Sequence, residues 1–201
     1  DPYDVVIVGD DAALRYAMAF REELFDGIPI VFEGVNDEEY ALEAAKNPLV
    51  TGILEKLSVE KNIDMALKVN PSADKVVAIL DDSVTGEAER KNFYSAEAKY
   101  PELEFSEINS SELTTAKLQQ AVSKVDENTI LIYIVMSNDG SGKQYTNAQA
   151  IRMLVTYSKV PVYRMVEAGI GDGLLGGNVV SMYKSGEIAA QMAMDIANGT
   201  D

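Results

Sequence analysis

The chain has 201 residues, 17 basic and 33 acidic side chains, and neither histidine nor cysteine, which excludes thiol nucleophiles, disulfides, the usual zinc sites and an imidazole base. With 47% hydrophobic and 25% charged residues, and no apolar run approaching the roughly 18 residues of a membrane-spanning helix, we expect a globular protein that does not insert into a membrane. The net charge of −16 repels a phosphate backbone, so we expect no nucleic-acid partner.

Hydrophobic periodicity alternates along the chain between strand-like and helix-like patterns. Short apolar or alternating runs predict strands at 5–8, 28–32, 50–54, 76–80, 103–108, 129–136 and 160–166. Apolar residues at helical spacing predict helices at 13–24, 38–46, 59–67, 87–100, 118–125, 147–158 and 184–198. This regular alternation indicates an α/β fold with parallel sheets and helices on both faces. We expect the chain to pass between two lobes at the polar break 55–58.

Ligands of doubly wound sheets bind beyond the carboxyl ends of the strands, so the residues that follow each strand are candidates. Asp10 and Asp11 follow the first strand, and either is also a suitable N-cap for the next helix. Gly34 and Asn36 follow the second strand, where glycine allows a close backbone approach and asparagine can pair with a polar group. A simple turn explains this second pair about as well.

Ser83, Thr85 and Gly86 follow the strand at 76–80 and begin a predicted helix. Their hydroxyls and backbone N–H groups suit a carboxylate or another small polar ligand. A different class of function is a Mg²⁺-dependent phosphotransfer enzyme that uses Asp81, Asp82 and, after a later strand, Asp139. The spacing of these acids fits such an enzyme poorly.

Two glycine motifs resemble phosphate-binding loops but lack their context. Lys143 follows Gly142 without the earlier glycine of a Walker loop, and 171–176 reads G-x-G-x-x-G after the last main strand instead of in the first βαβ unit. We therefore expect no nucleotide and no other cofactor. No strand end joins a nucleophile to an activating base, which favours a binding protein over an enzyme.

An ordered series of segments begins with Asp10-Asp11-Ala12-Ala13-Leu14-Arg15 and continues through 21–32, 34–36, 50–53, 64–67, 70–71, 160–163, 176–177 and 186–199. This series resembles the type I periplasmic-binding-protein-like domains related to ABC transporter substrate-binding proteins. Similar sequence segments occur in the extracytoplasmic sensor regions of bacterial membrane histidine kinases and diguanylate cyclases. The resemblance spans almost the whole chain and rests on the order of the segments, not on one motif.

The resemblance implies two αβα lobes with parallel sheets, joined by a hinge that closes on a small molecule. We expect residues 1–55, completed by about 178–201, to form the first lobe, and residues 56–177 to form the second. Members of the family begin with two further βα units before the strand at 5–8. The first lobe is therefore expected to be truncated at its N-terminus, and a start at Asp1 instead of Met agrees with an excised or processed chain.

The resemblance also implies which positions face the ligand. They are Asp10, Asp11, Gly34 and Asn36 in the first lobe, and Ser83, Thr85, Gly86, Ser137, Asn138, Asp139, Glu167 and Gly169 in the second. We expect no metal and no catalytic residue among them. Acidic residues near the expected cleft, Glu33, Glu167 and Asp172, favour a ligand with an amino group, such as an amino acid.

The function implied by the resemblance is that of an extracytoplasmic small-molecule sensor domain in a bacterial membrane signal-transduction protein. Hinge closure on a solute would shift an equilibrium that a membrane-anchored signalling partner reads. The nearest alternative is the solute-binding component of an ABC importer, whose partner is a permease. The sequence segment Arg21-Glu22-Glu23-Leu24-Phe25 favours the sensor.

Overall fold

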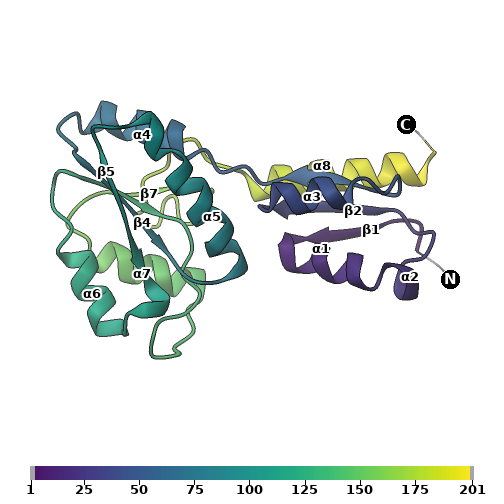
Figure 1. The fold of residues 1–201 in the computed structure, drawn as a ribbon, viewed down its shortest axis with the longest axis horizontal. Coiled ribbons are helices and arrows are strands. Elements are labelled where there is room, and N and C mark those ends of the chain that lie inside the picture. Colours follow the sequence, from purple (N-terminus) through teal and green to yellow (C-terminus); the bar gives the residue numbers. More distant parts are fainter. Residues whose placement is uncertain (1–2, 200–201) are drawn as a thin grey trace. The chain divides into compact units, whose positions relative to one another are not determined.

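Two parallel sheets organise residues 3–199, the part of the chain that this computed structural model describes (Figure 1). Each sheet belongs to its own unit. The first unit contains the described residues up to Lys56 and those from Ser181 onward, and the second unit is Leu57–Val180. The chain therefore crosses between the units twice, and only the second unit is continuous in sequence.

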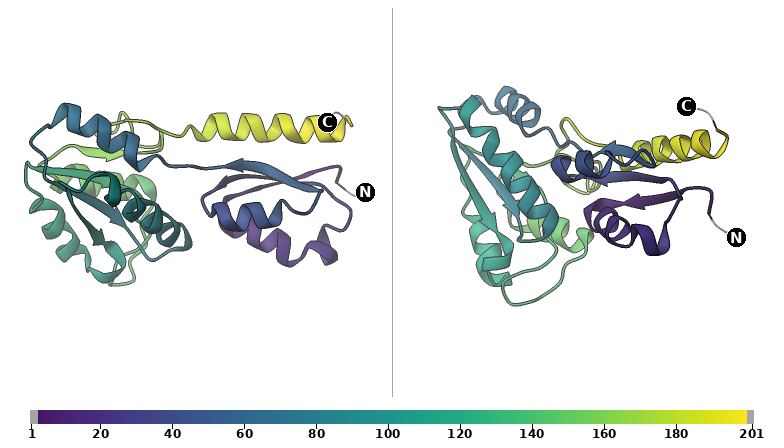
Figure 2. Two further views of the ribbon diagram at one scale, coloured as in Figure 1. Left: turned by 45° about the horizontal axis from the view of Figure 1, so that its top comes forward. Right: turned by 45° about the vertical axis from the view of Figure 1, so that its right-hand side comes forward.

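The first unit contains a three-stranded parallel sheet in the order β1, β2, β3. Its strands are β1 (Val6–Gly9), β2 (Ile30–Val35) and β3 (Val50–Leu54), and its helices are α1 (Asp10–Ala19), α2 (Arg21–Leu24), α3 (Glu38–Ala44) and α8 (Met182–Ala197). Apolar side chains of the strands pack on α1 and α3, with Leu14, Ile30 and Ala41 in the cluster. Helix α8 lies along the other face of the same sheet (Figure 2).

The second unit has four parallel strands in the order β5, β4, β6, β7. The strands are β4 (Lys75–Leu80), β5 (Glu104–Asn109), β6 (Thr129–Tyr133) and β7 (Val162–Arg164). The helices are α4 (Val59–Val69), α5 (Val84–Ser95), α6 (Thr115–Ser123) and α7 (Asn147–Tyr157), with 3-10 turns η1 (Glu97–Lys99) and η2 (Ser110–Glu112). One core cluster lies on the α4 and α5 side of the sheet and a second on the α6 and α7 side. The α/β architecture predicted from the sequence is thus confirmed.

The residues of β6, Thr-Ile-Leu-Ile-Tyr, are all buried because helices cover both faces of this central strand. The predicted strand at 129–136 is three residues too long, since the neighbouring strand β7 ends at Arg164, opposite Tyr133, and offers no further ladder. The predicted strand at 160–166 shortens to β7, where Pro161 has no N–H to donate before the strand begins.

Three predicted helices also differ from the structure, and the one expected over 118–125 is α6, which begins three residues earlier and ends two residues earlier. The helix expected over 13–24 is two helices, α1 and α2, which meet at Phe20. The helix expected over 87–100 begins earlier, at Val84, because the side chain of Ser83 accepts a hydrogen bond from the backbone N–H of Gly86 and caps it. It ends at Ser95, and η1 follows it.

A buried asparagine of α4 joins two segments that are distant in sequence. Asn62 is 0% exposed, and its Nδ2 donates to the carbonyl oxygens of Ser58, at 2.8 Å, and Asn178, at 2.9 Å. A Cβ atom on Gly177 would lie 2.0 Å from Asn62 Oδ1, so this position has room only for glycine. Ser58 and Asn178 each lie close to one of the two crossings between the units. Asn62 therefore holds both crossing segments together on the side of the second unit.

We expect Gly177→Ala to lower the free energy of unfolding by about 1–3 kcal/mol, because its methyl group would displace a buried, hydrogen-bonded amide. The penalty should shrink clearly in an Asn62→Ala background, where the clash is gone. Urea unfolding of the four proteins of this double-mutant cycle measures the difference. Gly186→Ala is the control, since a Cβ there meets open space within a helix. Equal penalties for Gly177→Ala in both backgrounds would contradict the proposed contact.

Candidate functional site

The strand order of the second unit reverses at β4. The chain leaves β4 through α5 to β5 on one side, and then passes through α6 to β6 on the other side. Helices α5 and α6 contribute to core clusters on opposite faces of the sheet. In doubly wound folds this divergence leaves a crevice at the carboxyl ends of the two central strands. The residues after β4 and β6 are therefore the candidate site.

Asp81 links the ends of these two strands. Its carboxylate is 0% exposed. Oδ2 accepts hydrogen bonds from Ser137 N at 2.7 Å and Ser137 Oγ at 2.5 Å, and Oδ1 accepts from Ser83 N at 3.1 Å and Ser83 Oγ at 2.5 Å. Burial is the largest single influence and raises the pKa of Asp81, but the bonds from Ser137 and Ser83 together outweigh it and hold the pKa below its ordinary value. Asp81 is an ionised anchor of the two loops.

The first turn of α5 presents the polar groups that remain. A Cβ atom on Gly86 would lie 2.1 Å from the carbonyl oxygen of Asp81, so glycine is required where the helix passes over this residue. Thr85 is half-buried, and its hydroxyl has no hydrogen-bond partner among residues 3–199. The first N–H groups of a helix also have no partner within the helix. This turn therefore offers donors to a small polar ligand.

Arg90 of α5 forms ion pairs with three acids at the same edge of the sheet. Its guanidinium donates to both carboxylate oxygens of Glu107 at 3.1 Å, to Asp82 at 2.9 Å and to Glu87 at 2.6 Å. Asn109, directly at the end of β5, donates to Asp82 at 2.8 Å. The loop after β4 is thus fixed to β5 as well as to β6.

The loop after β6 carries the other predicted residues of this unit. Asn138 accepts hydrogen bonds from Ser111 Oγ at 3.0 Å, through Oδ1, and from Ser110 Oγ at 2.8 Å, through its carbonyl oxygen. Ser111 Oγ also accepts from the backbone N–H of Asp82 at 3.0 Å. Ser83, Ser137 and Asn138 are therefore brought together in one hydrogen-bonded network that also contains Asp81.

The carboxylate of Asp139 fixes the loop that follows this residue. Its carboxylate is 3% exposed and accepts from Ser141 N and Oγ, Lys143 N, Tyr145 OH and Thr115 Oγ1. Burial, the largest single influence, raises the pKa of Asp139, whereas the bonds from Ser141, Thr115 and Tyr145 hold it well below its ordinary value. The three acids of the alternative magnesium site, Asp81, Asp82 and Asp139, each accept hydrogen bonds from donors of the same chain. The described part of the chain holds no group of three or more acidic residues placed to bind a metal ion.

Glu167 and Gly169 lie after β7. Glu167 is exposed, and its backbone N–H donates to the carbonyl oxygen of Val180 at 3.0 Å. Gly169 has a φ of +96°, and a Cβ atom there would lie 2.6 Å from Ile151 Cδ1 and 2.8 Å from Leu174 Cδ1. Packing against the α7 side of the core thus explains this glycine without a ligand.

In the first unit, Asp11 and Asn36 come together at the ends of the strands. Asp11 is buried, and its carboxylate accepts from the backbone N–H groups of Asn36 at 3.3 Å and Asp37 at 3.0 Å. Asn36 Nδ2 donates to the carbonyl oxygen of Glu55, just after β3, at 3.2 Å. Asp11 therefore holds the loop that follows β2.

Asp10 and Gly34 both have backbone conformations with positive φ, of +76° and +65°. Gly34 lies in an irregularity of the β2–β3 ladder, and a Cβ atom there would be 3.7 Å from Asp10 N. The expectation that Asp10 or Asp11 is the N-cap of α1 is wrong: Gly9 is the N-cap, and Asp10 Oδ1 accepts from the N–H of Asp11 at 2.6 Å. Asp10 is the first residue of α1 although its φ is positive, so this residue begins the helix with a left-handed backbone conformation.

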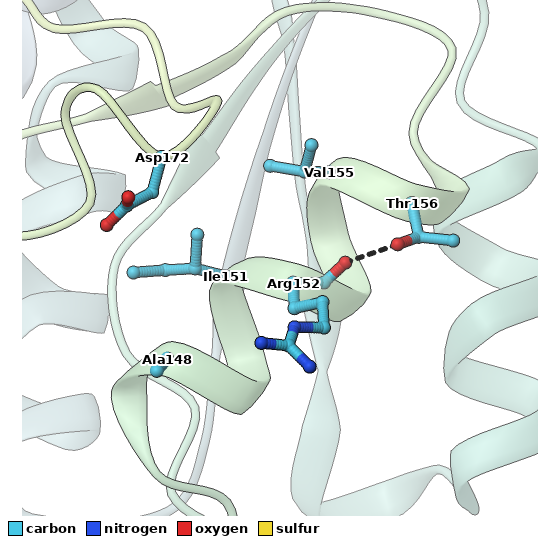
Figure 3. A pocket seen from close by; sticks show the side chains of 6 residues that line it. All are labelled: Ala148, Ile151, Arg152, Val155, Thr156 and Asp172. Atoms are coloured by element: carbon cyan, nitrogen blue, oxygen red, sulfur yellow. Dashed lines mark hydrogen bonds between the residues drawn. The ribbon is translucent and has the colours of Figure 1, made fainter.

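A cavity of about 330 Å³ lies beside α7 of the second unit (Figure 3). Among the described residues, its lining contains none of the predicted ligand-binding positions. Its wall includes Ile151, Arg152 and Val155 from the helix and Asp172 from the glycine-rich loop. The G-x-G-x-x-G segment therefore borders a helix side, and α8 begins only at Met182, so no helix N-terminus follows the glycines directly.

Three residues that support the site are not among those predicted from the sequence: Asn109, Ser111 and Arg90. Asn109 ends β5, so the strand-end rule applied to the predicted strand at 103–108 points to it. Arg90 has no such signal, because its role depends on three acids that converge only after folding.

A family profile described as "ABC transporter substrate binding protein" matches residues 2–201. A structure described as an ABC domain in complex with L-Trp from Streptococcus pneumonia aligns with a TM-score of 0.72 and 17% identity, over 100% of this chain and 68% of that chain. A conserved domain protein from Vibrio cholerae aligns with a TM-score of 0.69 and 18% identity, over 99% of this chain and 65% of that chain. This chain thus spans about two thirds of either length. No protein with a curated description matches the sequence.

We expect Asp81→Asn to lower the free energy of unfolding at pH 7 by about 1.5–3 kcal/mol, because the buried carboxylate loses charge-assisted hydrogen bonds. The pKa of Asp81 is lowered in the folded chain, so its stabilisation is complete above the ordinary carboxyl pKa and is lost as pH falls through the lower folded value. The difference between the two proteins should therefore shrink below about pH 4. Denaturant titrations from pH 7 downward measure it.

Asp172→Asn is the matched control, since this exposed carboxylate makes no side-chain hydrogen bond within the described residues. Its effect should stay near zero at every pH. A difference between the wild type and Asp81→Asn that does not change with pH would show that the charge of Asp81 is not what stabilises the loops.

Proposed function

Because the chain belongs to the family of ABC transporter substrate-binding proteins, we propose that it binds a small solute as the extracytoplasmic sensor domain of a bacterial membrane signal-transduction protein. The family is one of solute-binding domains and not an enzyme class. The observation that carries the proposal is the first turn of α5. There the Thr85 hydroxyl and the backbone N–H groups of Val84 and Thr85 have no acceptor among the described residues, whereas the N–H of Gly86 donates to Ser83 Oγ. The carboxylate of Asp81 accepts hydrogen bonds from Ser83 and Ser137.

The ligand class that we propose is an amino acid. A carboxylate is attracted to the N–H groups and the positive end of the dipole at a helix N-terminus. Thr85 adds a hydroxyl beside these groups. A structure that shares this fold at a TM-score of 0.72 is described as a complex with L-Trp, which supports the same class of ligand.

Two roles are assigned among the predicted ligand-binding positions. Thr85 and the N–H groups of Val84 and Thr85 contact the solute in this proposal, and Gly86, whose N–H donates to Ser83 Oγ, lets the helix pass close to Asp81 beside them. The acids and serines that make internal hydrogen bonds hold the loops in place, and they are Asp11, Ser83, Ser137 and Asp139. Asp10, Gly34, Asn36, Asn138, Glu167 and Gly169 remain proposed solute-facing positions.

Solute binding is proposed to act by hinge closure. Only two segments, at Lys56–Leu57 and Val180–Ser181, connect the units. Few connections allow the arrangement of two units to respond to a ligand that favours one state. A membrane-anchored signalling partner in the parent protein would then read this state. No helix among the described residues has the length and apolar character needed to cross a membrane.

The second candidate role is the solute-binding component of an ABC importer, which the description of the matching family favours. The sensor role rests on the resemblance at Arg21-Glu22-Glu23-Leu24-Phe25. The reading frame that encodes this chain separates the two. A membrane span followed by a kinase or cyclase domain supports the sensor, and a lipoprotein signal beside permease genes supports the importer.

We expect at least one common L-amino acid to raise the melting temperature of the protein, and calorimetric titration then gives its Kd. Thr85→Val should weaken binding about fivefold, because one hydrogen bond is lost while the shape of the side chain is kept. Ser95→Ala, an exposed change at the far end of the same helix, should leave the Kd unchanged. Lack of stabilisation by every amino acid, or an unchanged Kd in Thr85→Val, would contradict the proposal.

A further inference from the structure

A groove of about 290 Å³ lies between α6 and α7 of the second unit. Thr115 and Gln119 of α6 line it on one side and Arg152 and Met153 of α7 on the other. Lys143 and Tyr145, from the loop after β6, also line it. We call it the α6–α7 groove. None of the proposed solute-contacting residues, such as Thr85, lines it among the described positions, so it is separate from the site at the first turn of α5.

The α6–α7 groove is positively charged on a protein whose net charge is −16. Helices α6 and α7 contain no acidic residue, although the sequence has 33 of them. Lys143 and Arg152 form no ion pair with any acid in residues 3–199. Two uncompensated cations at one cavity in a strongly acidic chain favour an anionic ligand.

One acid, Asp139, lies next to the groove, and its carboxylate oxygens already accept hydrogen bonds from neighbouring residues. Asp139 is 3% exposed and accepts hydrogen bonds from Thr115 and from Tyr145, two residues of the groove wall. Its remaining bonds go to the loop at Ser141 and to Lys143 N. Asp139 therefore fixes the wall in place and points no free oxygen at the two cations.

The floor of the groove is apolar. Met153 and Tyr145 are buried there, so they present a fixed and largely dry surface. Lys143 Nζ lies 4.5 Å from the centre of the Tyr145 ring, which keeps the ammonium group above the floor. Arg152 also borders the neighbouring cavity, and in Figure 3 its guanidinium does not meet Asp172, the acid of that cavity. Cationic groups thus surround an apolar base.

We propose that the α6–α7 groove binds a small carboxylate with a flat apolar body, such as an aromatic carboxylate. The guanidinium of Arg152 and the ammonium of Lys143 would hold the carboxylate, and Tyr145 and Met153 would contact the ring. The volume of about 290 Å³ lies at the lower end for ligand pockets, which fits a single-ring molecule. Neither the proposed function nor the strand-end site requires this second ligand.

Benzoate is the probe, with benzamide as its uncharged analogue and inorganic phosphate as an anion without an apolar body. Titrations followed by amide chemical shifts should place benzoate at α6, α7 and the loop after β6. We expect benzamide and phosphate each to bind at least about tenfold more weakly than benzoate, because each lacks one of the two features that the groove recognises. Arg152→Gln and Lys143→Gln should each weaken benzoate binding about fivefold or more.

Lys117→Gln is the matched control, since this lysine lies on α6 and does not line the groove. It should leave benzoate binding unchanged, and so should Thr85→Val, which separates this site from the amino-acid site. Unchanged melting temperatures show that the exposed Arg152 and Lys143 variants are folded. Benzoate that fails to bind at about 10 mM, that binds the Arg152 and Lys143 variants as well as the wild type, or that phosphate matches in affinity would overturn the proposal.

Discussion

The carboxylate of Asp81 is the constraint on which the rest of the site depends. Parallel strands end at the same edge of a sheet but do not hold each other's following loops. Here one buried charge does so with four hydrogen bonds of 2.5 to 3.1 Å. A buried carboxylate is stable only when donors surround it. Ser83 and Ser137 are therefore needed to stabilise the charge of Asp81, just as Asp81 is needed to hold the two loops. The network then reaches β5 through Ser111 and Asn109.

The lowered pKa values of Asp81 and Asp139 affect which chemistry these two residues can support. A general acid or base must exchange protons near neutral pH, and the pKa values of Asp81 and Asp139 are both held below the ordinary carboxyl value by their donors. Such groups stay ionised and stay in place. A rigid rim with a free hydroxyl and free N–H groups at Thr85 is suited to recognising a solute, which agrees with membership of a solute-binding family.

The sequence predicts the parts of this structure that depend on local pattern. The seven strands are predictable because apolar residues must be buried, whereas the start of α5 is predicted three residues late because the cap formed by Ser83 is not anticipated. The predicted strand lengths are less accurate, since β6 ends where its neighbour β7 ends and not where its apolar residues end. The bonds of Asn62 to Asn178, 116 residues away, and the meeting of α6 with α7 leave no local pattern at all.

Helix α8 has a consequence for the order of folding. It covers one face of the β1–β3 sheet, and Ser185 donates to Glu33 of β2 at 3.1 Å, yet the whole second unit lies between them in sequence. Contacts of such long sequence separation form late, because the intervening chain must be ordered or tolerated as a loop. During synthesis the second unit is complete before α8 leaves the ribosome. The continuous unit can therefore fold first, and the first sheet keeps an uncovered face until the last helix arrives.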